Sequence, residues 1–263
     1  MNSFNPEDDS RDLLNFIIQN GMDAPEFTTV SDDRMTVHLT KLMTDSLTGQ
    51  RIGKFVTTLY KDLQKDSYGL VDIDLTFDGG KPVALRFLHK QPQSSEANEY
   101  YDVEVEGGGQ HLLVETVNRQ FAGKDEIEGS VLEVCASAFP FRLSVFDDIE
   151  TFNSAFGFGR QEGGNRIGGL SETFASPESL MSTEHEEGAG DVYSWLNGVV
   201  KSIREVSVDF GRRNIDFTIA YTETALGVIP VAMHREIFDL SELAPEKILV
   251  MYAYVKADFA AVQ

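Results

Sequence analysis

Two short rows of carboxylates have the residue types and the spacing to do chemistry. Asp72 and Asp74 alternate with apolar residues in one stretch, and Asp102, Glu104 and Glu106 do so in another. Alternation with a period of two predicts strands with one polar face, on which successive carboxylates lie about 6.6–6.8 Å apart. Phosphates along one DNA strand rise about 3.4 Å each, so such a row matches about every second phosphate. The five carboxylates are therefore predicted to contact a groove of Arg and Lys built for a nucleic acid.

The same carboxylates have two other interpretations. An Asp-x-Asp pair also occurs where carboxylates hold a divalent metal ion, but no further ligand accompanies Asp72 and Asp74 in the sequence. The polar face of an amphipathic strand explains both rows without any function, and like charges side by side destabilise a sheet unless salt screens them. The sequence predicts no catalytic residue, no metal ion and no cofactor.

Other chemical motifs are near misses. Residues 157–162 lack the third glycine of a dinucleotide fingerprint and follow an expected helix instead of a strand. The chain has no Walker-type lysine loop and no Gly-x-Ser-x-Gly elbow. Residues 184–187, Glu-His-Glu-Glu, lie in a glycine-rich stretch, which favours a solvated loop over a metal site. Cys135 lies in an apolar run, which favours a buried structural thiol over a nucleophile.

The charge of the chain is unusual for its length of 263 residues. Its 22 basic and 43 acidic residues give a formal net charge of −21. A chain of this charge is repelled by nucleic acids and anionic membranes and attracted to basic surfaces, many of which hold nucleic acid. Simple solubility, or adaptation to high salt, is the alternative explanation.

Three features of the sequence indicate the cellular compartment. A single cysteine excludes an intramolecular disulfide and fits a reducing environment. The first residues are acidic where a signal peptide is basic and then apolar. The longest apolar runs, such as 248–255, are too short to span a bilayer. We therefore expect a cytoplasmic protein, in the host cytoplasm if it is phage-encoded.

Two windows of the chain share a helical spacing of apolar residues. Six positions at i, i+3, i+4, i+7, i+8 and i+11 are apolar in each window. They are Ile52, Phe55, Val56, Leu59, Tyr60 and Leu63 in the first window, and Val192, Trp195, Leu196, Val199, Val200 and Ile203 in the second. This spacing predicts two amphipathic helices of about three turns.

Each window is followed by two alternating stretches around a short polar turn, which predicts a β-hairpin. The hairpins cover 71–87, with the turn at 78–81, and 206–221. A helix-plus-hairpin unit is thus predicted twice, at 50–89 and at 191–221. Elsewhere the sequence predicts helices at 5–21, 110–121 and 147–156, and strands at 27–30, 35–39, 101–105, 131–136, 142–146, 227–233 and 248–255.

These elements predict an α+β fold with two related lobes, each an amphipathic helix packed on a small antiparallel sheet. The N-terminal lobe covers 1–156 and the C-terminal lobe 191–263. Between them, 157–190 contains eight glycines, which predicts a linker or a long surface loop.

In overall character the chain resembles phage-encoded nucleic-acid mimics and acidic inhibitors of host nucleases or RNA-processing enzymes. The resemblance rests on acidity, compactness and the lack of a catalytic signature. It covers no motif, so it implies no role for any residue. It implies a viral, non-enzymatic inhibitor.

The sequence thus predicts a non-enzymatic protein-interaction module that covers a basic, nucleic-acid-binding surface of a partner protein. The expected contacts are Asp72, Asp74, Asp102, Glu104 and Glu106, with no direct binding of nucleic acid or membrane. One alternative is a structural or assembly protein that forms homo-oligomers, with a homodimer as the simplest case. The other is an enzyme whose carboxylate or metal site forms only in three dimensions.

Overall fold

A computed structural model of the chain describes residues 24–30, 34–62, 67–94, 99–123, 126–158, 161–162, 165–166, 168–177, 192–209 and 214–259. Its contacts group into two compact units. Unit 1 comprises Met1–Asp78 and Glu205–Phe217, and unit 2 comprises Gly79–Arg204 and Thr218–Gln263. Each unit is described separately below.

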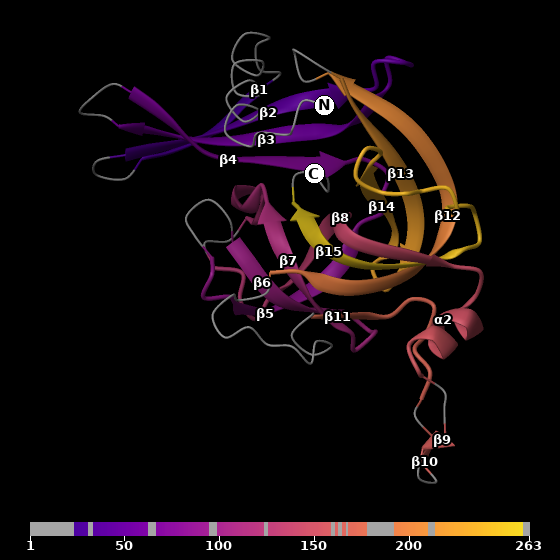
Figure 1. The fold of residues 1–263 in the computed structure, drawn as a ribbon. Helices are drawn as coiled ribbons and strands as arrows, with labels where there is room; N and C mark the ends of the chain where they lie inside the picture. The colour runs from indigo at the N-terminus through magenta and orange to yellow at the C-terminus, as the bar shows by residue number, and fades with distance from the viewer. Residues whose placement is uncertain are drawn as a thin grey trace. The chain divides into compact units, whose positions relative to one another are not determined.

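Unit 1 is built on a four-stranded antiparallel sheet in the order β1-β2-β3-β4 (Figure 1). Its strands are β1 (Ala24–Val30), β2 (Arg34–Thr44), β3 (Arg51–Asp62) and β4 (Ser67–Phe77). Apolar side chains of β2, β3 and β4 are buried, among them Met43, Phe55 and Phe77. The Phe77 ring lies edge-on to Phe217, with centroids 5.6 Å apart, so residues 205–217 share this core.

Asp45, at the end of β2, anchors residues 205–209 to unit 1. Its side chain is fully buried and accepts hydrogen bonds from the backbone N–H groups of Leu47 and Ser207 and from the Thr48 hydroxyl. Its backbone also forms an isolated antiparallel bridge with Val208. A carboxylate with these donors is satisfied in the interior, which explains an acid at a fully buried position.

Unit 2 contains the other strands and short helices. The elements are β5 (Val83–Lys90), β6 (Glu99–Val105), β7 (His111–Val117), η1 (Arg119–Ala122), β8 (Val131–Phe146), α2 (Ile149–Ala155), β9 (Gln161–Glu162), β10 (Asn165–Arg166), β11 (Ala175–Pro177), β12 (Ser194–Asp209), β13 (Asn214–Thr224), β14 (Gly227–His234) and β15 (Ile248–Asp258). The last residues of β12 and the first of β13 group with unit 1.

The nine-stranded sheet of unit 2 closes on itself twice. Its order is β11-β12-β13-β14-β8-β15-β7-β6-β5, with additional pairings of β12 with β15 and of β8 with β5. These pairings close two rings, β12-β13-β14-β8-β15 and β5-β6-β7-β15-β8, which share the long antiparallel pair β8–β15. Closure leaves few unpaired strand edges within this sheet.

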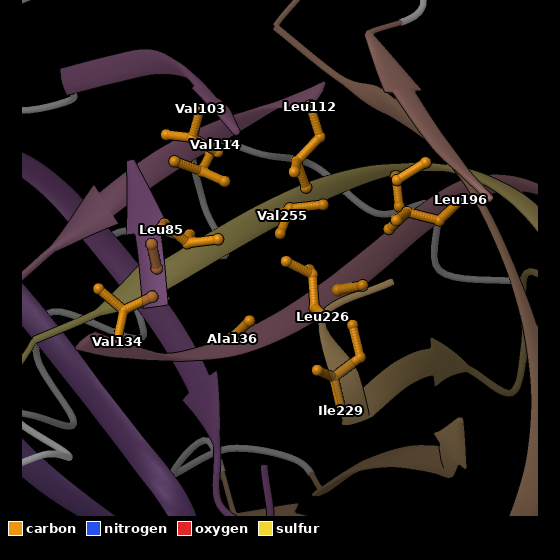
Figure 2. Packing of buried hydrophobic residues seen from close by; sticks show 14 of the residues in the cluster. Leu85, Val103, Leu112, Val114, Val134, Ala136, Leu196, Leu226, Ile229 and Val255 are labelled. Carbon is orange, nitrogen blue, oxygen red and sulfur yellow. The ribbon is translucent and has the colours of Figure 1, made fainter. Parts of the chain in front are cut away.

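One apolar core runs through both rings. Figure 2 labels Leu112 of β7, Val255 of β15 and Leu196 of β12 within this one cluster, so the core includes side chains of both rings. A second apolar cluster, around Phe152, Trp195 and Val199, lies on the opposite face of β12 and β15 and includes residues of α2. Residues 194–200 of β12 and 248–251 of β15 are therefore buried on both faces.

The predicted α+β fold with two helix-on-sheet lobes is wrong, because the described chain is mostly strand and α2 is its only α-helix. Residues 52–62 of the first window lie in β3, and residues 194–203 of the second lie in β12. In β12, Trp195 and Val199 enter the outer cluster, whereas Leu196 and Val200 enter the core. A strand buried on both faces carries apolar residues at any spacing, so it can imitate a helical period.

The predicted hairpin at 71–87 is also wrong. Strand β4 pairs with β3 in unit 1, whereas β5 pairs with β6 and β8 in unit 2. Gly79 and Gly80 permit close packing where the chain passes between the units: a Cβ at Gly79 would lie 2.4 Å from the Tyr221 ring. Glycine at 79 thus serves a close approach and not a tight turn.

Other predicted elements have mixed outcomes. The strands at 27–30, 35–39, 101–105, 227–233 and 248–255 and the helix at 147–156 are confirmed. The helix at 110–121 is wrong, since its first part is β7, and the strands at 131–136 and 142–146 are one strand, β8. The helix at 5–21 lies outside the described residues.

The boundaries of the predicted lobes, 1–156 and 191–263, differ from those of the two contact units. The predicted linker, 157–190, is described only in part, and in that part β11 pairs with β12 and is buried. Its role as a boundary stays a prediction. In the part of the chain that the structure describes, no helix has the length and apolar composition to cross a bilayer.

Candidate functional site

The two predicted carboxylate rows lie in different units. Asp72 and Asp74 are on β4 of unit 1, in register with Thr58 and Val56 of β3. The Asp74 side chain is only 6% exposed, so it is poorly placed to meet a partner. The described part of the structure says nothing of the Asp72 side chain. Of the other three carboxylates, Asp102 and Glu104 lie on β6 of unit 2, and Glu106 directly follows it.

The β6 row, defined as Asp102, Glu104 and Glu106, faces a cation on the neighbouring strand. Arg86 of β5 lies 3.0 Å from Glu106 and 3.8 Å from Glu104, measured between its guanidinium nitrogens and the carboxylate oxygens. Alternation of buried and half-buried residues along β6 confirms the predicted polar face. Arg86 nevertheless offsets part of the row's charge, which makes the row a cross-strand ion-pair surface.

Asp102 has a different environment from its two neighbours. It pairs in register with His89, and its Oδ1 lies 3.9 Å from Nδ1 of His111. That oxygen is buried and has no hydrogen-bond partner among the described residues. Burial raises the pKa of the Asp102 carboxyl, and the nearby imidazoles of His111 and His89 oppose this rise.

A more exposed group of carboxylates surrounds Lys201 of β12. Its Nζ lies 3.0 Å from Glu223 of β13. The hydrogen bond to Glu223 raises the pKa of Lys201, and the charges of Glu223, Glu246 and Glu172 act in the same direction. Several carboxylates therefore share the field of one ammonium group.

The group continues to the start of α2 through Glu246 and Lys247. Backbone hydrogen bonds of 2.7 and 2.9 Å hold these two residues beside Val200, the neighbour of Lys201. Lys247 in turn forms an ion pair with Asp147. We call acidic patch the set Asp147, Asp148, Glu150, Glu172, Glu223 and Glu246 with Lys201 and Lys247. Six carboxylates and two lysines give it a formal charge of −4, and all six carboxylate residues are exposed.

Helix α2 begins in this acidic patch. The Asp148 side chain accepts a hydrogen bond of 2.7 Å from the backbone N–H of Thr151 and thus caps the helix. This hydrogen bond lowers the pKa of the Asp148 carboxyl. At its other end the helix leads to Phe156, which is 45% exposed and packs edge-on to Trp195.

The outward side of β8, β15 and the start of β12 carries aromatic side chains. Alternate β15 residues belong to the core, so Tyr252 and Tyr254 point the other way. Register places Phe139 opposite Tyr254 and Arg142 opposite Tyr252. We call aromatic face the set Phe139, Phe141, Arg142, Tyr193, Tyr252 and Tyr254. Phe141 and Tyr254 are 37% and 36% exposed, respectively.

A β-bulge directs Phe141 onto this aromatic face. Consecutive residues Tyr252 and Ala253 pair with Arg142 and Pro140, which leaves Phe141 as the extra residue. Its ring lies 4.5 Å from Tyr193 and 5.8 Å from Tyr254, measured between centroids. Pro140 lacks an N–H donor, and bulges are one of the few places where a sheet accepts proline.

Sequence reasoning missed both the acidic patch and the aromatic face. A signal for the aromatic face was present, since three segments carry two aromatic residues two positions apart: Phe139 and Phe141, Tyr193 and Trp195, Tyr252 and Tyr254. For the acidic patch, 147–150 was visible as an acidic stretch. Its grouping with Glu172, Glu223 and Glu246 has no local signal.

The remaining candidates add no chemistry within the described residues. The Sγ of Cys135, half-buried, lies 3.8 Å from the Gly80 carbonyl oxygen. Residues 184–187 lie outside the described part of the chain. Among the described residues, no three His, Cys, Asp or Glu side chains are grouped so that they could hold a metal ion.

Comparison with known proteins gives no relative. No protein-family model matches the chain, and no curated protein or solved structure matches it.

Proposed function

We propose that the protein is a non-enzymatic interaction module whose acidic patch binds a basic surface of a partner protein, such as one that holds nucleic acid. One observation carries the proposal: five exposed carboxylates from separate segments interact with two lysines, and Glu150 follows in the first turn of α2, in a chain of net charge −21. The contacts proposed from the structure thus differ from the five carboxylates that the sequence singles out.

Exposure and charge favour the acidic patch over the β6 row. In the β6 row one arginine lies between two of the three carboxylates, and the third is partly buried. In the acidic patch all six carboxylate residues are exposed and the formal charge is −4, against −2 for the β6 row with Arg86. The chain's overall field adds to the local one. Charges of this kind accelerate encounter with a basic partner and fix its orientation more than they tighten the final complex.

A deca-arginine peptide is a suitable minimal probe of a basic surface. Binding is measured by calorimetry at about 50 mM and about 200 mM salt, where we expect the affinity to fall about ten-fold because exposed charges are screened. The variant Glu150→Lys/Glu172→Lys/Glu246→Lys removes three patch carboxylates and should abolish most of the binding. In rapid-mixing experiments the association rate should fall first.

The matched control is Glu126→Lys/Glu133→Lys/Glu236→Lys, three exposed carboxylates of unit 2 outside the acidic patch. Each triple variant changes the net charge from −21 to −15, because each substitution adds two positive charges. The control should keep most of its affinity. Equal losses in the two variants, or an affinity that does not change with salt, would contradict the proposal.

A further inference from the structure

Residues 168–177, which we call the strap, are held to unit 2 largely by side chains of other elements. The only strand in the strap is β11, whose residues pair with Ser194, Trp195 and Leu196 of β12. Residues 168–174 lie outside any strand or helix. The backbone N–H and C=O groups of such a segment need partners from elsewhere in the fold, and polar side chains provide them here.

Asn153 of α2 provides the first attachment of the strap. Its Oδ1 accepts a hydrogen bond of 2.8 Å from the backbone N–H of Leu170, and its Nδ2 donates one of 3.2 Å to the Leu170 carbonyl oxygen. A single side-chain amide thus satisfies both backbone groups of one residue, as a neighbouring strand would. The Leu170 side chain also packs against the apolar cluster around Phe152 and Trp195, which fixes the same end of the strap.

Asn197 of β12 and Gln110 provide the second attachment. The backbone N–H of Asn197 donates a hydrogen bond of 2.8 Å to the Phe174 carbonyl oxygen. The Gln110 Oε1 accepts a hydrogen bond of 2.7 Å from the backbone N–H of Ala175. The strap is therefore attached on both sides of Glu172.

Glu172 is an exposed carboxylate of the acidic patch, and it lies between these two attachments. The hydrogen bond to Glu223 is the largest cause that raises the pKa of Lys201, and the charge of Glu172 acts in the same direction. A carboxylate on a loose segment would spread its charge over many positions. Where the strap is held therefore decides where the Glu172 charge lies.

We propose that Asn153 is a positioning residue of the acidic patch, because it holds the strap so that Glu172 lies beside Lys201. This inference rests on the function proposed above and keeps the same class of basic partner. A carboxylate that is fixed before binding loses less conformational entropy when a cation meets it. The two events are coupled: a cation bound at Glu172 stabilises the attached strap by the same factor by which attachment strengthens binding.

Hydrogen exchange followed by NMR tests the attachment without any ligand. Asn153→Ala should raise the exchange rates of the Leu170 and Ala175 amides by about ten-fold, because the strap opens more often. The control Ser154→Ala, at an exposed position of the same helix, should leave both rates unchanged. Each variant is first compared with the wild type by thermal melting to establish that it folds. Wild-type exchange rates in Asn153→Ala overturn the proposal.

The titration of Lys201, followed by NMR of its side chain from about pH 9 to 12, tests whether the strap places Glu172. Glu172→Gln should lower the pKa of Lys201, because it removes a nearby negative charge. Asn153→Ala should lower that pKa too. The double variant should lower it no further than Glu172→Gln alone, because Asn153 acts through Glu172. A wild-type pKa of Lys201 in Asn153→Ala, or additive effects in the double variant, overturn the proposal.

Deca-arginine binding separates this inference from the proposed function. Asn153→Ala changes no charge, yet it should weaken binding about two- to five-fold, as Glu172→Gln does, whereas Ser154→Ala should bind as the wild type does. Wild-type affinity in Asn153→Ala overturns the positioning role. A wild-type chain that does not bind deca-arginine contradicts the proposed function instead, and exchange and titration then decide whether Asn153 positions Glu172.

Discussion

The acidic patch and the aromatic face belong to the same unit, yet they differ in how they are built. Most of the aromatic face lies on the middle of β8 and β15, where outward side chains extend a packed cluster. Most of the acidic patch follows β8, precedes β15 or begins α2, and it groups around Lys201 of β12. Its carboxylates are solvated, whereas the rings of the aromatic face pack on buried neighbours.

The two surfaces also show which features can indicate a binding site in a strongly charged chain. At a net charge of −21, an exposed carboxylate is expected anywhere on the surface. A group of carboxylates becomes informative when all its members are exposed and it keeps a large net charge, as the acidic patch does. The β6 row is smaller, and Asp102 and Glu104 in it are only half-exposed.

Removal of the Phe152 ring should have the largest effect on the free energy of unfolding. Phe152 is fully buried and joins α2 to the outer side of β12 and β15. Phe152→Ala should lower the free energy of unfolding by about 3–5 kcal/mol through lost burial and the cavity left behind. Urea unfolding followed by fluorescence of Trp195, the single tryptophan, measures this change.

Phe156→Ala is the matched control for that experiment, since the Phe156 ring is much more exposed and packs on the same tryptophan. Phe156→Ala should lower the free energy of unfolding by well under half as much as Phe152→Ala does. Equal losses from the two substitutions would mean that burial does not distinguish the inner from the outer part of the aromatic cluster.

Gly198 should have the next largest effect, because β12 carries Trp195 of the aromatic cluster and Lys201 of the acidic patch. A Cβ at Gly198 would lie 2.5 Å from Thr222 Cγ2 and 2.7 Å from the Glu223 carbonyl oxygen. Gly198→Ala should therefore destabilise the protein by about 1–3 kcal/mol and weaken deca-arginine binding. A Cβ at Gly168 would meet no other atom within 4 Å, so the control Gly168→Ala should leave the thermal midpoint unchanged.

Salt provides a smaller but more specific test of the comparison. Between about 50 mM and about 200 mM salt, deca-arginine binding should weaken about ten-fold, because salt screens the exposed carboxylates of the acidic patch. Calorimetry on one wild-type preparation measures this change. An affinity that does not change with salt would show that the exposed charges do not drive the binding.

The smallest expected effect concerns pH and the start of α2. Hydrogen bonds from Thr151 lower the pKa of Asp148 below its ordinary value of 3.8. Its ionised form therefore stabilises the fold fully above 3.8, and this contribution is lost as pH falls through the lower, folded-state pKa. The difference in thermal midpoint between wild type and Asp148→Ala should be constant from neutral pH to about 5 and shrink below about 4.

The ionisation of Asp102 should change stability with pH in the opposite direction to that of Asp148. Burial raises its pKa above 3.8, so its ionisation costs stability as pH rises from 3.8 through the raised value. Asp102→Asn should remove that decline. A decline that persists in the variant would show that other groups cause it.

Parts of the fold were predictable because their signals are local. The alternation of Val103 and Val105 with carboxylates predicts the half-exposed strand β6, and Asp148 followed by Ile149 and Phe152 predicts α2. The windows at 52–63 and 192–203 failed because β3 and β12 are buried on both faces. Their apolar residues then satisfy a helical period by coincidence, although Gly53, Gly198 and the β-branched residues disfavour a helix.

The sequence by itself determined the charge, the lack of a recognisable catalytic motif and the pairs of aromatic residues two positions apart. Only the tertiary structure decided which charges stand alone and which are paired. Arg86 offsets Glu104 and Glu106 because strands β5 and β6 are neighbours, and Glu172, Glu223 and Glu246 gather because their segments converge on Lys201. The energy of a charge depends on neighbours a few ångströms away in space, and strand pairing brings such neighbours from distant parts of the chain.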